Sequence, residues 1–293
     1  MTNDIKGGVF ILDYINGFEE WLKEKDKSKN TISCYLRDVK EFEGWLSILD
    51  FSGLREVPQI FLIHFKKFQK GTGASITTIN RKLASVNSFY KYMYQKGFIN
   101  EELKVEPYKD KDVKQYKGLE ESELWKLRTE IHKSKNLFHI CIFEILINTG
   151  IRVSELVNIK LSDIQISERK GSLTVIGKGE AKRTVPLNKN VRKAIKKYLQ
   201  VRKNDDNEYL LIGQRGKLER NAVNLILEKY GSRVGIKVTP HMARHTLGYN
   251  LIKQGVPITT IQQVLGHENI QTTNTYTLTI ERDIVDALEE IEW

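Results

Sequence analysis

The chain has 293 residues, 40% hydrophobic and 29% charged, and 47 Lys and Arg against 37 Asp and Glu give a net charge of +10. This length predicts about two domains of roughly 150 residues, each with its own core. The composition excludes a disordered chain, and the absence of a long apolar run excludes a membrane-spanning one. Cys34 and Cys141 are too few for a disulfide scaffold or a cysteine-based zinc site, and the start MTNDIKGG is unlike a signal peptide. We therefore expect an intracellular protein with an anionic partner.

The positive charge is unevenly distributed along the chain. Residues 1–117 hold 20 basic and 16 acidic side chains, residues 118–276 hold 26 and 15, and residues 277–293 hold one and six. Residues 57–100 contain seven Lys or Arg and no acidic residue. Such a stretch is typical of a surface that faces phosphates, although a solvated basic face has the same composition. Because two separate regions are basic, we expect a nucleic-acid partner.

The first hundred residues have the periodicity of helices. Apolar residues recur at three- and four-residue intervals over residues 11–22 and 32–46, and Asn30 suits the N-cap of the second helix. Pro58 is placed to open a third helix that ends before Gly71.

A fourth helix is predicted over residues 76–95, with Ser75 before it and Gly97 after it. Four helices predict a small helical domain at residues 1–105. Residues 106–118, EPYKDKDVKQYKG, are charged and show no apolar period, so we expect a linker there.

The second half mixes helices with a small sheet. Residues 120–132 and 135–148 have helical patterns, and Gly150 closes the second. Short β-branched runs within residues 163–187 predict a three-stranded antiparallel sheet. The remaining patterns predict a short strand at residues 209–212 and helices at residues 188–203, 220–233, 240–254 and 257–265. The expected fold class is mainly α with a small antiparallel β-sheet, in which residues 119–276 form a second, α+β domain.

Four motifs contain residue types that bind phosphate or move protons. They place Arg152 and Glu155 in TGIRVSEL, Lys178 in the turn GKGE, His241 and Arg244 in HMARH, and His267 and Tyr276 in LGHENIQTTNTY. Each motif also has an ordinary interpretation, as an ion pair, a solvated turn lysine or a structural aromatic. A zinc site at His241 and His245 is disfavoured because Met242 stands where the H-E-x-x-H motif needs glutamate.

Together these residue types suit the transfer of a phosphodiester. Two arginines match the non-bridging oxygens and stabilise a five-coordinate transition state without a metal. A tyrosine hydroxyl, with a pKa of about 10, is a weak nucleophile that attacks a phosphate held by cations. A lysine on a hairpin protonates the leaving alkoxide, and histidines assist.

The set resembles the tyrosine recombinases, or phage integrase family, over residues 117–276. All six expected positions carry the family's residue types, including the nine-residue spacing from His267 to Tyr276. Residues 9–97, with the run SITTINRKLASVNSFYKYM, are similar to the family's helical core-binding domain.

The resemblance implies a role for each residue of the set. Tyr276 would be the nucleophile, Arg152, Arg244 and His267 the phosphate ligands, Lys178 the general acid, His241 an aid to proton transfer, and Glu155 a support. It implies two domains that clamp duplex DNA. Strands would be exchanged through a 3′-phosphotyrosyl intermediate and a Holliday junction, without ATP, cofactor or metal. The partners would be paired core sites and a homotetramer, in a cytoplasmic bacterial protein that is nucleoid-associated on DNA.

The acidic tail at residues 277–293 is predicted to be a helix for contact between protomers. Its apolar stripe consists of Ile280, Ile284, Val285, Leu288 and Ile291. Relatives donate such a helix to a neighbour, and we favour this interpretation over packing on the tail's own domain.

Base-reading residues are harder to place than the catalytic set. The expected DNA-binding residues are Lys66, Lys67, Thr77, Asn80, Arg81, Lys82 and Lys91. Thr77, Asn80 and Arg81 lie near the start of the fourth helix, where a groove-entering helix usually contacts bases, although Thr77 suits helix capping equally well.

Two other functions remain open at this stage. A type IB topoisomerase uses a similar residue set, but the tail helix and the integrase-like first domain argue against it. A non-catalytic DNA-binding regulator is disfavoured by the intact catalytic set. The short segment before the first helix favours the compact, Xer-like type, which leaves dimer resolution, transposon integration and plasmid resolution as alternatives.

Overall fold

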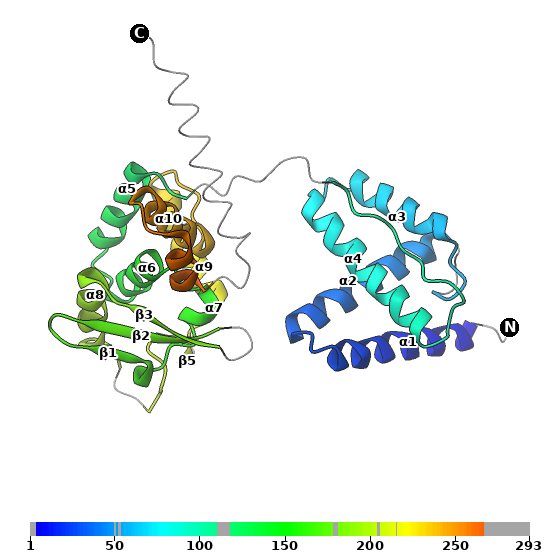
Figure 1. Cartoon of the computed structure of the whole chain (residues 1–293), viewed down its shortest axis with the longest axis horizontal. Helices are drawn as coiled ribbons and strands as arrows, with labels where there is room; N and C mark the ends of the chain where they lie inside the picture. Colours follow the sequence, from blue (N-terminus) through cyan, green and yellow to red (C-terminus); the bar gives the residue numbers. More distant parts are fainter. Residues whose placement is uncertain are drawn as a thin grey trace, which may run out of the picture. The chain divides into compact units, whose positions relative to one another are not determined.

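The computed structural model describes residues 4–49, 51, 54–109, 118–177, 181–203, 206–214 and 216–266, with the side chains of residues 4–13 excepted. The chain divides into two compact units, Met1–Val113 and Lys114–Trp293 (Figure 1). Each unit has its own hydrophobic core. The predicted fold class, mainly α with small antiparallel sheets, is confirmed.

The described part of the first unit is helical. Its helices are α1 (Asp4–Glu24), α2 (Lys29–Ile48), α3 (Gln59–Gly71) and α4 (Ile76–Gln95). The predicted cap at Asn30 is wrong, because the Ser28 hydroxyl accepts from the Thr31 N–H and starts α2 two residues earlier. Ser75 caps α4 as predicted, by accepting from the Thr78 N–H.

Aromatic side chains fill the core of the first unit. Phe42 and Phe65 are fully buried with ring centroids 4.8 Å apart, and Phe18 meets Phe89 edge to face at 5.3 Å. Each such side chain contributes about 1.5–3 kcal/mol by its burial. These helices therefore hold one another through rings that the apolar periodicity had placed on their inner faces.

The start of the predicted linker packs on the first unit. Val105 is buried in its core, and the Tyr108 backbone exchanges two hydrogen bonds of 2.8 Å with the Asn80 side chain. Residues 110–117 lie outside the described residues.

In the second unit a small sheet lies at one side of a group of helices (Figure 1). Its described helices are α5 (Glu121–Lys133), α6 (Leu137–Thr149), α7 (Val153–Leu156), α8 (Lys189–Leu199), α9 (Arg220–Arg233), α10 (Pro240–Lys253) and α11 (Ile258–Leu265), with a short 3-10 turn, η1 (Leu161–Asp163). A part of the predicted strand at residues 209–212 forms instead an isolated bridge between Tyr209 and Lys160. Its last residue opens β4 (Ile212–Gly213), which pairs with β5 (Gly216–Lys217).

The predicted three-stranded sheet is present in the order β1-β2-β3. It consists of β1 (Ile164–Ile166), β2 (Gly171–Ile176) and β3 (Lys182–Pro186), all antiparallel. Leu173 lies opposite Val185, and Val175 lies opposite Arg183, so these four side chains share one face. The three apolar ones are buried, and that face points into the core.

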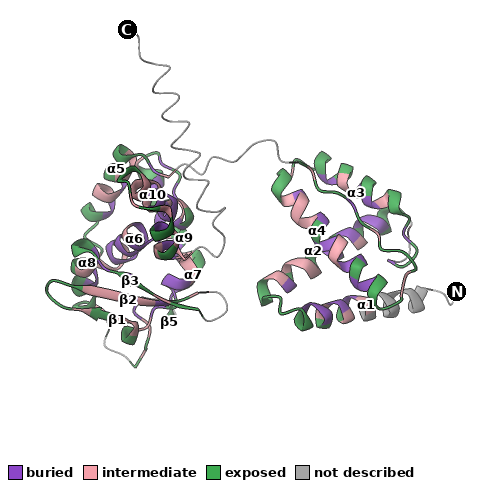
Figure 2. Ribbon diagram, in the orientation of Figure 1, coloured by how far each residue is buried: buried purple, intermediate pink, exposed green. Residues whose placement is uncertain are grey.

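Helix α6 lies in the middle of the second unit. Nine of its 13 residues are buried, as the purple in Figure 2 shows, because most of its sequence is apolar and its buried Glu144 is paired with Arg128. It ends at Gly150, which has φ of +62°. A Cβ on Gly150 would lie 2.6 Å from Leu265 Cδ2 and 3.0 Å from Leu247 Cδ2, so glycine is required on both counts.

Gly150→Ala should therefore destabilise the protein by more than the usual cost of replacing a glycine that has a positive φ, because the new Cβ also meets Leu265 and Leu247. The matched control is Gly255→Ala, because Gly255 has φ of +74° and open space where a Cβ would lie. We expect a loss of about 1 kcal/mol in the control and at least about 1 kcal/mol more in Gly150→Ala. Urea unfolding measures both, and equal losses would contradict the packing argument.

Candidate active site

Arg152 lies at the start of α7, directly after the turn that ends α6. Its N–H donates to Glu155 Oε2 at 2.8 Å, and its Nη1 donates to Glu155 Oε1 at 3.1 Å. Its Nη2 donates to the backbone carbonyl of Gly266 at 2.9 Å. The last two bonds fix the guanidinium group, although the side chain is still 41% exposed and accessible to a ligand.

Glu155 is a buried carboxylate that two arginines share. Arg183 on β3 donates to it in a bidentate pair, Nη1 to Oε1 and Nη2 to Oε2, both at 2.8 Å. Burial raises the pKa of Glu155, but the hydrogen bonds from Arg183 and from the Arg152 backbone outweigh it, so the pKa lies below its ordinary value. Glu155 is therefore ionised at neutral pH.

Arg244 extends from α10 to the end of α6. Thr239 caps α10 with Pro240 at its first position, which sets the direction of the helix. Arg244 is 3% exposed, and its Nη1 donates to the Gly150 carbonyl at 2.7 Å. The carbonyls at a helix C-terminus carry partial negative charge and are a favourable place for a guanidinium.

His241 lies one turn before Arg244 on α10. Desolvation, followed by the charges of Arg244 and Arg152, lowers the pKa of His241 below its ordinary value. The imidazole is therefore neutral at pH 7. Its ring lies 4.1 Å from that of His245, centroid to centroid, and His241 also borders a groove of 790 Å³ that Val153 and Lys237 line.

Gly266, the residue before His267, ends α11 and contacts both Arg152 and Arg183. Its carbonyl accepts from Arg152, and a Cβ on it would lie 2.8 Å from Cζ of Arg183. Lys178, His267 and Tyr276 lie outside the described residues. The structure thus brings together Arg152, Glu155, His241 and Arg244, with Gly177 and Gly266, the residues that precede Lys178 and His267.

The sequence analysis missed Arg183. The available signal was its place in β3, two residues before the buried Val185, which puts an arginine on the inward face of a strand. A cation on an apolar face requires a buried partner, which the structure identifies as Glu155. No group of three or more His, Cys, Asp or Glu suited to a metal ion occurs in the described part of the chain.

The expected DNA-binding residues of the first unit divide into two kinds. The side chains of Lys67, Thr77 and Lys91 are exposed. Others are engaged within the unit: Asn80 with the Tyr108 backbone, Arg81 with Asp38, Lys82 with Glu41 at 2.5 Å, and Lys66 with the Glu106 carbonyl at 2.6 Å. Of these residues, Lys67 and Lys91 are the exposed cations.

Two family descriptions match the sequence. Residues 117–281 match the Phage integrase family, and residues 15–97 match the Phage integrase, N-terminal SAM-like domain. Tyrosine recombinase XerA of Thermococcus onnurineus is 35% identical over 273 residues, covering 91% of each chain. Tyrosine recombinase XerC of Thermodesulfovibrio yellowstonii is 32% identical over 285 residues, covering 90% of this chain and 91% of the relative.

Solved structures share the fold. XerH site-specific recombinase, in a post-cleavage complex with a palindromic difH substrate, matches with a TM-score of 0.77 and 19% identity over 98% of this chain and 89% of that chain. A lambda integrase tetramer bound to a Holliday junction matches with a TM-score of 0.71 and 15% identity over 90% of this chain and 76% of that one.

Fold and site together define a mainly helical enzyme with two fixed arginines beside a histidine. The chain belongs to the phage integrase family of tyrosine recombinases, as the resemblance in its motifs predicted. It is a site-specific DNA recombinase. None of the helices that the structure describes is long and apolar enough to cross a membrane.

Glu155→Gln should destabilise the enzyme in a pH-dependent way. Because the folded pKa of Glu155 is lowered, the carboxylate stabilises the fold above its ordinary pKa of about 4.5, and this stabilisation is lost as the pH falls through the folded pKa. At pH 7 we expect a loss of about 3 kcal/mol, since the buried Arg183 loses its ion-pair partner.

Urea unfolding at a series of pH values from 7 downward measures this difference. The stabilities of wild type and variant should begin to converge as the pH falls below about 4.5, and convergence should be complete only once the pH has fallen through the lowered pKa of the folded carboxyl. A difference that stays constant over that range would contradict the assignment of Glu155 as the ionised member of the pair.

Proposed function

We propose that this recombinase cuts and rejoins duplex DNA through a covalent bond between Tyr276 and the 3′ phosphate of the break. The observation that carries the proposal is the placement of Arg152 and Arg244. Each guanidinium is fixed by a backbone carbonyl, and the charges of both act on His241. Two fixed cations beside a neutral imidazole are suited to bind one phosphate group.

The arginines bind the non-bridging oxygens of the scissile phosphate. In the five-coordinate transition state these oxygens carry more negative charge than in the ground state, so the fixed guanidiniums bind the transition state more strongly. Arginine keeps its charge at any accessible pH, which makes a metal unnecessary for this purpose. His267 adds a hydrogen bond to the phosphate.

The remaining residues move protons. The Tyr276 hydroxyl attacks phosphorus, so that an O–P bond to tyrosine forms and the bond to the 5′ oxygen breaks. Lys178 gives a proton to that leaving oxygen, and His241, which is neutral at pH 7, assists proton transfer. A free 5′-hydroxyl of the partner strand then attacks the phosphotyrosine and releases the enzyme. One phosphodiester replaces another, and no ATP is needed.

The substrate is duplex DNA with paired core sites. Residues 1–105 supply a core-binding domain and residues 119–276 the catalytic domain, joined by a linker at residues 106–118 that lets them clamp the duplex. The support for this arrangement is the basic charge of both regions and the similarity to recombinases solved on DNA. We propose a homotetramer in the synapse, formed through the tail helix at residues 277–293, in a cytoplasmic protein that associates with the nucleoid.

The first test is a covalent complex. The wild-type protein, incubated with a suicide duplex that carries its footprinted site and a nick beside the cleavage position, should form an adduct that survives denaturing electrophoresis. Tyr276→Phe should form none while binding the same duplex with unchanged affinity. Arg152→Ala should lower the rate of adduct formation by about 10²–10³-fold.

This test also separates the alternative functions. A protein that forms no adduct with its footprinted site is a DNA-binding regulator. A protein that forms adducts on any duplex and relaxes supercoils without exchanging strands is a topoisomerase of type IB.

The second test concerns the tail. Deletion of residues 279–293 should abolish synapsis and strand exchange while leaving the binding of a single site within about twofold, because the deleted acidic segment pairs with protein and not with DNA. Gel-shift and recombination assays measure the two activities.

A point variant provides the matched comparison for the deletion. Leu288→Glu lies on the apolar stripe and should weaken exchange, whereas Asp286→Asn lies off the stripe and should not. Full strand exchange by the deletion variant would contradict the proposed contact between protomers through the tail.

A further inference from the structure

Arg183 is an almost buried cation that lies where three segments of the active site meet. It lies on the inward face of β3, opposite Val175, and its side chain is 17% exposed. Both of its terminal nitrogens are used by Glu155. Its Nε is buried and has no hydrogen-bond partner within the part of the chain that the structure describes.

The first segment in contact with Arg183 is the one that carries Arg152. Glu155 accepts from Arg183 on one side and from the backbone and side chain of Arg152 on the other. Arg152 therefore takes its position from a carboxylate that Arg183 holds.

The second segment is the hairpin that carries Lys178. Arg183 lies two residues after Ala181, whose carbonyl accepts from the Gly177 N–H at 2.8 Å and closes the base of the turn. A Cβ on Gly177 would lie 3.8 Å from Nη1 of Arg183 and 3.9 Å from Oε1 of Glu155. The base of the hairpin thus lies directly against the ion pair.

The third segment is the end of α11, which leads into His267. Gly266 lies on the guanidinium of Arg183, since a Cβ there would be 2.8 to 2.9 Å from Cζ, Nε and Nη1. Its carbonyl is the acceptor for Arg152. This close approach requires glycine, and φ of +66° at Gly266 requires it as well.

We propose that Arg183 is a positioning residue of the recombination reaction, which sets Arg152, the Lys178 hairpin and the His267 segment relative to one another through Glu155 and Gly266. This inference rests on the proposed function. Arg183 touches neither DNA nor the reacting atoms, and its effect is geometric. A planar, bidentate guanidinium fixes the carboxylate in two directions at once, which the single ammonium of lysine does not.

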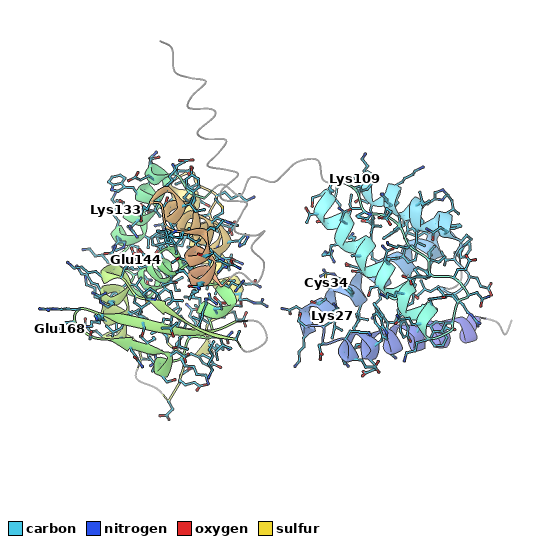
Figure 3. All side chains as sticks on the ribbon, viewed as in Figure 1. Lys27, Cys34, Lys109, Lys133, Glu144 and Glu168 are labelled. Atoms are coloured by element: carbon cyan, nitrogen blue, oxygen red, sulfur yellow. The ribbon has the colours of Figure 1, made fainter. Side chains whose placement is uncertain are left out.

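A matched ion pair in the same unit provides the control. Arg128 donates to Glu144 through Nε at 3.0 Å and Nη2 at 3.1 Å, and the Glu144 side chain is 3% exposed, as is that of Glu155. Glu144 lies on α6, labelled in Figure 3, and its partners Arg128, His132 and Asn148 come from α5 and α6 and are not residues of the site. Arg128→Gln therefore removes a comparable buried pair without disturbing the active site.

The experiment compares the single-turnover rate of adduct formation at saturating suicide duplex, together with Kd and urea stability. Arg183→Gln and Arg128→Gln should both lose stability. Only Arg183→Gln should form the adduct more slowly, by about 10²-fold, with Kd within about threefold of wild type. Arg183→Lys keeps the charge, and we expect it to fold and bind DNA but to remain at least about tenfold slow.

A double-mutant cycle tests whether Arg183 acts through Glu155. The variant Arg183→Gln/Glu155→Gln should form the adduct no more slowly than the slower of the two single variants, because the second change removes a contact already lost. Multiplicative losses would overturn this part of the proposal.

Three results would overturn the proposal as a whole. The first is a rate loss in Arg128→Gln equal to that in Arg183→Gln, and the second is a wild-type rate of adduct formation in Arg183→Lys. The third is a raised Kd in Arg183→Gln with an unchanged rate at saturating duplex, which would make Arg183 a DNA contact. Failure of the wild-type protein itself to form an adduct is a different outcome and overturns the proposed function. A wild-type adduct with normal Arg183 variants overturns only the inference made here.

Discussion

The active site depends on one buried carboxylate. Glu155 is 6% exposed, and its ionised form is kept in the interior because Arg152 and Arg183 supply four hydrogen bonds to its two oxygens. Burial of a charge is costly unless it is paired and hydrogen-bonded in this way. Since the partners come from the start of α7 and from β3, the same pairing also ties the helical layer to the sheet. The same contacts therefore determine both the stability of this region and the position of Arg152.

Arg244, the second arginine of the site, is held by the C-terminal end of α6, close to Arg152. Helix α6 is buried along its length and ends at Gly150, where the last carbonyls have no partner within the helix. Arg244 supplies a donor to one of them from α10. Arg152 lies two residues beyond Gly150, so the end of one core helix sets the positions of both guanidiniums. A turn that needs glycine for its backbone and for its packing thus lies at the centre of the site.

Local patterns predicted most of the fold. Apolar periodicity located the long helices, Ser75 and Gly150 marked the ends where the structure has them, and the β-branched runs gave the sheet. Helix α7 was missed because four residues are too few to show a period. The cap at Asn30 was misplaced because the Ser28 hydroxyl accepts from the Thr31 N–H and begins the helix at Lys29, which leaves Asn30 within its first turn. The contact between Tyr108, in the predicted linker, and Asn80 left no local signal in the sequence, because the two residues lie 28 positions apart.

The sequence by itself determined the family and the residue types of the catalytic set, because the chemistry of phosphate transfer restricts Arg152, His241 and Arg244 and their spacing shows in the motifs. The roles of all six residues, Arg152, Lys178, His241, Arg244, His267 and Tyr276, remain predictions from those motifs. Only the tertiary structure decided which cationic side chains stay exposed and which form ion pairs with buried carboxylates. Arg81 pairs with Asp38, and Arg183 pairs with Glu155. Such pairings join residues 28 or more positions apart, and they depend on strand register and helix packing, which no local pattern records.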